Sequence, residues 1–364
     1  MILKEIYSNR LLDFSYCDDG MRKRTKVTLL TLLFAVAYLL YVYGPSLSSV
    51  VNSSVEKTHS SFIAENGSIE LYFCPDEDCE GAFLSLLESA NVSVHCALYD
   101  INLPSVQETL RTKAAVIDVE IVTDDDNIKK FNESFVRKDK FGLMHDKFCI
   151  IDGKHVSTGS MNPTKNDAHL NNNNLLIIES GRLAGVYDDE FEEMWGGKFK
   201  GGNMSVNNAI ELSGTPLEVY FCPEDACAYH AKEELKKAQT SILFMTFSFT
   251  HDEIGDMLLL KKADGLVVRG VMEKTQLSDF SEYGRLIKND VDVLIDGNSH
   301  NLHHKVFIID GKTVVTGSFN PSANGDEHND ENVIVLHNVA LAQAFTKEWE
   351  KVYGIAKEAG ESKN

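Results

Sequence analysis

A pattern of polar residues occurs twice in this chain, and both copies have the same internal spacing. In each copy a His precedes a Lys by two positions, an Asp by seven, a Ser by fifteen and an Asn by seventeen. The first copy comprises His145, Lys147, Asp152, Ser160 and Asn162, and the second His303, Lys305, Asp310, Ser318 and Asn320. Such a repeat predicts two similar domains packed about a pseudo-two-fold axis, as in an isologous dimer, and sharing one site.

The segments around each copy predict the fold. Each repeat opens with an apolar strand, at 69–73 or 217–221, and then alternates helices with strands. Each closes on a helix that carries Phe191 and Trp195, or Phe345 and Trp349, which we expect to seal the core. We therefore predict an α/β fold of two pseudo-symmetric sheet domains, at 68–196 and 216–355. A linker rich in Gly and Asn occupies 197–215, and a short tail occupies 356–364.

The N-terminal region contains a candidate membrane anchor. Residues 27–43 are apolar and uncharged, at the short end of what crosses a bilayer. A basic cluster precedes them, so the positive-inside rule predicts a signal anchor with a cytoplasmic tail at 1–26. A stalk at 44–67 and both domains then lie on the outer or lumenal side. A cleaved signal peptide is the alternative, but no small-x-small site follows Tyr43.

The charge of the chain restricts how it can bind a polyanion. The formal net charge is −20 over 364 residues, which opposes long-range attraction of nucleic acid. Any nucleic acid must therefore be held by local positive charge.

The cysteines also repeat in register. The pairs are Cys74 with Cys79 and Cys222 with Cys227. A short disulfide in each half is the first choice, given the expected location outside the cytosol. A zinc site shared by four thiolates and free buried thiols are the alternatives. Cys96 and Cys149 lie in apolar strand segments, where we expect them in the core.

The residue types of the repeated pattern suit chemistry on a phosphodiester. One imidazole can attack phosphorus to form a phosphohistidine, while the other, protonated, delivers a proton to the leaving alkoxide. The lysines, asparagines and serines can donate to the phosphoryl oxygens. Because this set neutralises phosphate without a metal, we expect neither metal nor cofactor. We interpret the acidic patch at 124–126 as a solvated loop end.

Asp152 and Asp310 have two interpretations. Each can orient the neighbouring Lys or His, and on that ground both belong to the catalytic candidates. Each also precedes a Gly at a predicted hairpin turn. Turn chemistry favours the structural role.

The two motifs resemble the His-Lys-Asp signature of the phospholipase D superfamily. Each half is similar in length and layout to the small endonuclease of that superfamily and to its mitochondrial-outer-membrane member. The resemblance implies a phosphohistidine mechanism with one histidine from each half, no required metal, and an acidic residue after each motif that holds the histidine. Glu331 matches that acidic position in the second repeat, whereas Asn173 occupies it in the first.

This difference bears on which histidine is the nucleophile. A carboxylate on the far imidazole nitrogen fixes the tautomer and raises basicity, whereas an Asn only orients the ring. On that chemistry His303, with Glu331, is the better nucleophile or base. The single-chain members of the superfamily instead imply His145. Both histidines and both lysines are therefore kept as catalytic candidates with Glu331, and Asn173 is grouped with the residues expected to bind phosphate.

Three function classes remain. We favour a membrane-anchored nuclease that acts on single-stranded nucleic acid, as a monomer with one shared site. The alternative is a phospholipase D or phosphatidyltransferase, similar to a cardiolipin hydrolase, acting on membrane phospholipid. A binding module without turnover is disfavoured because both motifs are complete. A nuclease needs aromatic stacking, for which the candidates are Tyr72, Tyr99, Tyr220 and Phe247. A lipase needs an apolar mouth, to which residues 281–302 can contribute.

Overall fold

The structure is a computed structural model, which describes residues 62–140 and 142–361. These residues belong to one compact unit. The predicted cytoplasmic tail, the anchor at 27–43 and most of the stalk lie outside the described residues. Within the described ranges, no helix has the length and apolar character needed to cross a bilayer.

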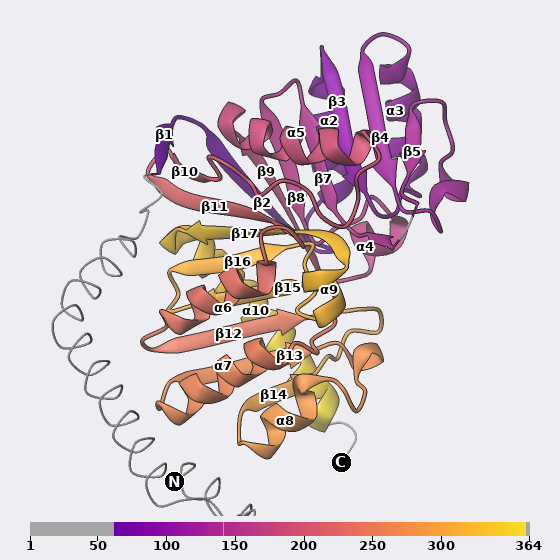
Figure 1. Ribbon diagram of the computed structural model, residues 1–364. Helices are drawn as coiled ribbons and strands as arrows, with labels where there is room; N and C mark the ends of the chain where they lie inside the picture. The colour runs from indigo at the N-terminus through magenta and orange to yellow at the C-terminus, as the bar shows by residue number, and fades with distance from the viewer. Residues whose placement is uncertain (1–61, 141, 362–364) are drawn as a thin grey trace, which may run out of the picture. The chain divides into compact units, whose positions relative to one another are not determined.

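The first half is built on a seven-stranded sheet (Figure 1) with the strand order β2-β9-β8-β7-β3-β4-β5. Strands β3, β4 and β5 are parallel to one another, and the other neighbours are antiparallel. The strands are β2 Ser68–Cys74, β3 Ser93–Leu98, β4 Asp118–Thr123, β5 Val136–Lys138, β7 Lys147–Ile151, β8 His155–Gly159 and β9 Asn173–Glu179. The helices are α2 Cys79–Ser89, α3 Pro104–Ala114, the 3-10 turn η1 Ile128–Lys130, α4 Lys165–His169 and α5 Gly181–Trp195.

The second half repeats this order as β11-β17-β16-β15-β12-β13-β14, which confirms the predicted α/β sheet in each repeat. Its strands are β11 Thr215–Cys222, β12 Ser241–Thr246, β13 Val267–Met272, β14 Asp292–Ile295, β15 Lys305–Ile309, β16 Thr313–Gly317 and β17 Asn329–His337. Its helices are α6 Cys227–Lys236, α7 Asp252–Ala263, the 3-10 turn η2 Lys274–Gln276, α8 Glu282–Lys288, α9 Ala323–Glu327 and α10 Val339–Glu361.

Two short strands lie in segments that we expected to be irregular. Strand β1, Ile63–Glu65, falls within the predicted stalk, and β10, Ala209–Leu212, falls within the predicted linker. They pair in parallel, and β10 continues the second sheet beyond β11. The pairing explains why these stretches are ordered without an apolar period of their own.

The two sheets share one apolar core. Alternate side chains of each strand face opposite ways, so Phe148 of β7 enters the shared core while its neighbour Cys149 lies under α2 and α3. Helices α5 and α10 contribute Phe191, Phe345 and Trp349, which are almost fully buried, as predicted for the closing helices. The outer face of the second sheet is covered by α6, α7 and α8.

Three disulfides join the cysteines of the described residues. The repeated pairs, Cys74 with Cys79 and Cys222 with Cys227, are both bonded, as the first-choice interpretation predicted. A third disulfide joins Cys96 and Cys149, which are buried as expected but which the sequence did not pair. These two residues lie opposite each other on the neighbouring strands β3 and β7.

Candidate active site

In each half, the motif residues gather at one end of three neighbouring strands. His145 precedes β7, Ser160 and Asn162 follow β8, and Asn173 starts β9. Because β8 is antiparallel to both neighbours, its end lies beside the starts of β7 and β9. The second half places His303, Ser318 and Asn320 in the same way around β15, β16 and β17.

The strand ends of the two halves that carry the motif residues contact each other through backbone hydrogen bonds. Strand β6, Leu143–Met144, pairs in parallel with the first residues of β17 in the other half. The backbone N–H of His145 donates to the carbonyl of Asp330 at 2.9 Å. Reciprocally, His303 N–H donates to the Asn172 carbonyl at 2.9 Å. Each histidine is therefore anchored on the last strand of the opposite half.

This exchange decides which residue supports which histidine. His145 Nδ1 lies 2.7 Å from Glu331 Oε2, whereas His303 Nδ1 lies 2.8 Å from Asn173 Oδ1. Our assignment of Glu331 to His303 is therefore wrong. Glu331 belongs to the second repeat by sequence, but β17 carries it to the histidine of the first. Asn173, grouped with the phosphate-binding residues, instead accepts the Nδ1–H of His303.

A second carboxylate stands near His303 that the sequence did not single out. Asp167 Oδ2 lies 3.6 Å from His303 Nδ1 and accepts hydrogen bonds from the backbone and side-chain amides of Asn162. Burial alone would raise the pKa of Asp167, but His303 and the neighbouring amides hold it below its usual value. In the second copy Gly325 takes the matching position. An alignment of the two copies beyond the motif would have revealed this difference.

The two buried lysines each donate a hydrogen bond to the backbone of the neighbouring histidine. Lys147 Nζ donates to the carbonyl of His145 at 2.6 Å, and Lys305 Nζ to that of His303 at 2.8 Å. Burial lowers the pKa of Lys147 to about 8, although Glu331 and Asp167 oppose the shift. Burial also lowers the pKa of Lys305, with the neighbouring Lys147 adding to the effect. Both ammonium groups therefore lie in a dry site, where they act strongly on an anion.

Burial sets the protonation of the remaining groups. Burial, reinforced by the two lysines, lowers the pKa of both His145 and His303 well below the usual value, which favours the neutral imidazoles as long as no phosphate anion is bound beside them. Burial raises the pKa of Glu331 to about 7, although Lys147 opposes the shift. A neutral imidazole beside an ionisable carboxylate is the arrangement that a nucleophilic histidine requires.

The serines of the motif have a structural contact in this structure. Ser160 Oγ donates to Asn173 Oδ1 at 2.9 Å and accepts from the backbone of Asn174, while Ser318 Oγ accepts from that of Asn332. These bonds tie the end of β8 to β9, and the end of β16 to β17. The serines therefore fix the strands that present Glu331 and Asn173.

Asp152 and Asp310 do not reach this site. They directly follow the far ends of β7 and β15, five residues and therefore about 16 Å from the lysines at roughly 3.3 Å per residue. Asp152 accepts the backbone N–H groups of residues 91–93, and Asp310 those of residues 239–241. Including them among the catalytic candidates is therefore wrong, and the turn interpretation holds.

Two further acidic residues are buried, and one of them, Asp124, belongs to the patch that we expected to be solvated. Asp146 is fully buried and accepts from Asn332 Nδ2 at 2.6 Å, and burial raises its pKa to about 7. Asp124, which we took for part of a solvated loop end, is 1% exposed, and burial raises its pKa to about 6. His304, the residue after His303, faces away from the site, and its Nε2 lies 3.4 Å from Glu348 Oε1.

Aromatic rings flank the two histidines. The Tyr99 ring lies 5.0 Å from the His145 ring, and the Phe247 ring 4.9 Å from that of His303. The other two predicted stacking residues have different contacts: Tyr72 donates its hydroxyl to Glu70, and Tyr220 stacks on His230. Only Tyr99 and Phe247, of the four, border the described site.

Known proteins share this fold and arrangement. Residues 83–195 and 231–353 match the family described as cardiolipin synthase, PLD-like domain. The chain therefore belongs to the phospholipase D-like family and is a phosphodiesterase.

Individual relatives match one or both halves. A phospholipase D of Rickettsia conorii is 34% identical over 143 residues, which cover 39% of this chain and 72% of the relative. A mitochondrial cardiolipin hydrolase of Danio rerio is 32% identical over 33% of this chain and 54% of its own length. The crystal structure of a phosphatidylserine synthase from Haemophilus influenzae covers 78% of this chain and 86% of its own, with a TM-score of 0.57 and 11% identity. That likeness shows the fold across both halves.

Proposed function

We propose that the protein is a membrane-anchored nuclease that cleaves single-stranded nucleic acid through a phosphohistidine on His145. The observation that carries the mechanism is the 2.7 Å contact between His145 Nδ1 and Glu331. Positive charge develops on the imidazole that attacks phosphorus, and a carboxylate at Nδ1 stabilises that charge better than an amide does. The carboxylate contact favours His145 as nucleophile over His303.

The proposed reaction has two steps. In the first, Nε2 of His145 attacks phosphorus, the bond to the leaving alkoxide breaks, and protonated His303 gives that alkoxide its proton. In the second, His303 takes a proton from water, the water oxygen attacks phosphorus, and the P–N bond breaks. Lys147, Lys305 and the amide groups of Asn162 and Asn320 stabilise the phosphoryl oxygens throughout.

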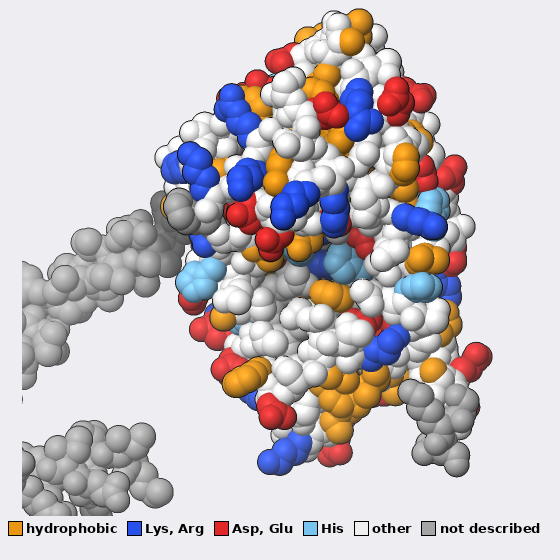
Figure 2. All heavy atoms as spheres, turned by 90° about the vertical axis from the view of Figure 1, so that its right-hand side faces the viewer, with side chains coloured by type: hydrophobic (Ala, Val, Ile, Leu, Met, Phe, Trp, Pro, Cys, Tyr) orange, Lys and Arg blue, Asp and Glu red, His pale blue; other side chains and the backbone are white. Residues whose placement is uncertain are grey.

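Local positive charge supports a polyanionic substrate. We define the basic patch as the exposed Lys and Arg residues Lys129, Lys130, Arg137, Lys138, Lys140, Lys198 and Lys200. Figure 2 shows Lys and Arg side chains gathered on the upper part of one face, above exposed histidine. In the sequence, residues 137–140 stand shortly before the loop that carries His145. The backbone N–H of Lys200 donates to the side chain of Asp330, whose carbonyl accepts from the His145 N–H. Phosphates beyond the reacting one can bind along this patch despite the net negative charge.

Cleavage of membrane phospholipid is the second candidate. The specific observation in its favour is Phe280, which is 83% exposed and lines a hollow together with Leu277, Tyr283 and several polar and charged side chains. The names of the relatives from Rickettsia conorii and Danio rerio point the same way.

We propose that residues 27–43 anchor the chain, with the N-terminus cytoplasmic and the enzyme on the outer or lumenal side. The apolar run and the preceding basic cluster support the orientation. Three disulfides support an oxidising compartment for the part of the chain that the structure describes. Protease accessibility in sealed membranes tests the topology.

The test of substrate uses the detergent-solubilised full chain, with His145→Asn as the inactive control. Labelled single-stranded oligonucleotides, duplex DNA, and mixed micelles of phosphatidylglycerol or cardiolipin are offered side by side. We expect cleavage of the single strands without lipid turnover. Lipid turnover without nucleotide cleavage would replace the nuclease by the second candidate.

A further inference from the structure

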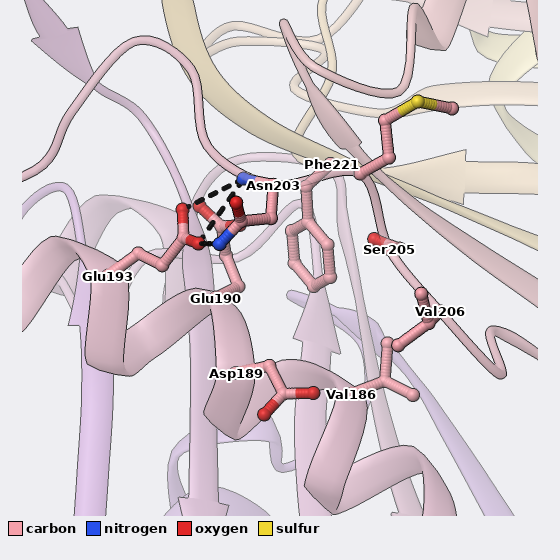
Figure 3. A pocket seen from close by; sticks show the side chains of 9 residues that line it. Val186, Asp189, Glu190, Glu193, Asn203, Ser205, Val206 and Phe221 are labelled. Carbon is pink, nitrogen blue, oxygen red and sulfur yellow. Dashed lines mark hydrogen bonds between the residues drawn. The ribbon is translucent and has the colours of Figure 1, made fainter.

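Three carboxylates converge at a second place, away from the two histidines. Glu190 and Glu193 lie on α5, and Glu224 follows β11 in the other half. One oxygen from each lies within 4.8 Å of the others. We call these three residues the acidic cluster. Figure 3 shows Glu190 and Glu193 at a pocket that is closed on one side by Asn203 of the segment between the halves.

Among the described residues, two of the three carboxyl groups have no basic side chain in an ion pair with them. Glu190 is only 9% exposed, and its partner is the carboxyl group of Glu224, so that a hydrogen bond between them needs a shared proton. Glu224 Oε2 is buried without a hydrogen-bond partner. Glu193 alone is satisfied, by the amides of Asn203 and by Lys198 Nζ at 3.0 Å. Buried carboxylates without partners are costly, so this arrangement requires a proton or a cation.

The pseudo-symmetry of the molecule indicates whether a proton or a cation occupies the acidic cluster, because each of its residues has a counterpart in the other half. Ser180 and Asn338 begin α5 and α10 with the same side-chain cap, so Glu190 corresponds to Glu348 and Glu193 to Lys351. Likewise Glu224 and Asp76 each stand two residues after the cysteine that ends the opening strand.

The corresponding contact between the halves, where α10 meets the segment after β2, contains a basic side chain of the protein itself. Lys351 Nζ lies 2.6 Å from Glu348 Oε2 and 2.6 Å from Asp76 Oδ2. One junction between the halves therefore has an ammonium group between two carboxylates. The other junction has a third carboxylate, Glu193, where the ammonium would be, and Lys198 Nζ lies 3.0 Å from Glu193 Oε2.

We propose that the acidic cluster binds a Ca²⁺ ion in the place that corresponds to the Lys351 ammonium group. Its ligands are carboxylate oxygens alone, which select hard cations, and an irregular, partly open arrangement with room for water suits Ca²⁺ better than Mg²⁺. The backbone at Gly202 passes so close that a Cβ there would collide with Glu193 and Glu224. The ion thus joins α5, the segment between the halves, and the end of β11, without touching the reacting phosphate.

The test measures binding and stability of the detergent-solubilised full chain after removal of metal with chelator. We expect one Ca²⁺ per chain by titration calorimetry, and a rise in Tm of about 3–6 °C at a hundredfold excess over Kd. Glu190→Gln and Glu193→Gln should abolish both effects, whereas Glu350→Gln, an exposed carboxylate on α10, should change neither. Turnover of the folded enzyme should persist in excess chelator, because the ion lies outside the histidine site.

A second variant keeps the proposal open to refutation even if the first ones unfold. Glu193→Lys restores the charge pattern of the matching junction, and we expect it to make Tm independent of Ca²⁺. Absence of binding in the stripped wild-type chain, with Tm unchanged by Ca²⁺, would overturn the proposal and leave Glu190 and Glu224 as a pair sharing a proton. Binding that survives both Gln variants, or a Tm response to Mg²⁺ alone, would overturn it as well. None of these readouts depends on nuclease or lipase activity.

Discussion

The first and second halves have the same strand order but distribute their carboxylates differently. The first half has Asp167 in α4 and Asn173 in β9, whereas the second has Gly325 and Glu331 at the matching positions. Because the start of each half's last strand contacts the histidine of the opposite half, His145 receives the carboxylate directly and His303 receives an amide with a carboxylate 3.6 Å away. Two substitutions are thus enough to give two related histidines different electrostatic surroundings.

A second difference concerns how the strands are held together. In the first half Cys96 and Cys149 form a disulfide between β3 and β7. At the matching pair of positions in the second half, the rings of Phe244 and Phe307 lie tilted against each other with centroids 6.1 Å apart. The first half uses a covalent bond where the second uses apolar contact, so the two should respond differently to reduction.

The strongest test of the comparison separates the two histidines by their roles. On a nitrophenyl phosphodiester, whose leaving group needs no proton, His303→Asn should release one equivalent of nitrophenolate in a burst and then turn over slowly. His145→Asn should give no burst and lose on the order of 10⁴- to 10⁶-fold in rate. Rapid-mix absorbance measures both.

The wild-type chain on the same ester serves as the control, with steady turnover after mixing. A burst from His145→Asn and none from His303→Asn would reverse the assignment of nucleophile and acid.

The next largest effect should come from the disulfide of the first half. Its loop spans 53 residues, so replacing both Cys96 and Cys149 by Ala should lower the free energy of unfolding by about 4 kcal/mol. Denaturant unfolding under non-reducing conditions measures this, and activity of the folded variant should remain near wild type. Replacing Cys222 and Cys227 gives the comparison, because their loop is only five residues long and a much smaller loss is expected. Equal losses from the two pairs would contradict this account.

Glu331→Gln should lower kcat on the order of 10²-fold and change its pH dependence. Burial raises the pKa of Glu331 to about 7 and the ionised form supports His145, so wild-type activity should rise as pH increases through about 7. The Gln variant cannot ionise and should lack this rise. The measurement is kcat against pH for both enzymes. Retention of the rise in the variant would assign it to another group.

The smallest effect should come from the supporting carboxylate of His303. Asp167→Asn should lower kcat about tenfold and lower the pKa of His303, which ¹⁵N NMR of the imidazole reports without any substrate. The double change Asp167→Gly with Asn173→Glu gives the first half the pattern of the second and should restore most of the rate. Failure of the double variant to recover, with its fold intact, would show that Asp167 acts only through Asn162.

The sequence was sufficient for the features that repeat locally. The spacing from His145 to Asn162 and its second copy predicted one composite site, and the cysteine pairs five residues apart predicted two of the three disulfides. Alternation of apolar segments predicted α/β halves. In each of these, the residues that interact are close in sequence or repeat at fixed spacing.

The missed features all depend on contacts between distant segments. Glu331 and His145 are 186 residues apart, and their contact depends on β6 pairing with β17. The bond between Cys96 and Cys149 depends on the register of β3 against β7. Asp167 escaped notice because a short helix, not the spacing of the motif, carries it to His303.

The reciprocal anchoring of the histidines also has a consequence for how the halves can diverge. In a dimer of identical subunits, every substitution appears on both sides of the axis. Here residues 196–208 join the halves covalently, so each always meets the other at a high effective concentration and never a copy of itself. A residue such as Asn173 or Gly325 is then tolerable in one half, since the other supplies what it lacks.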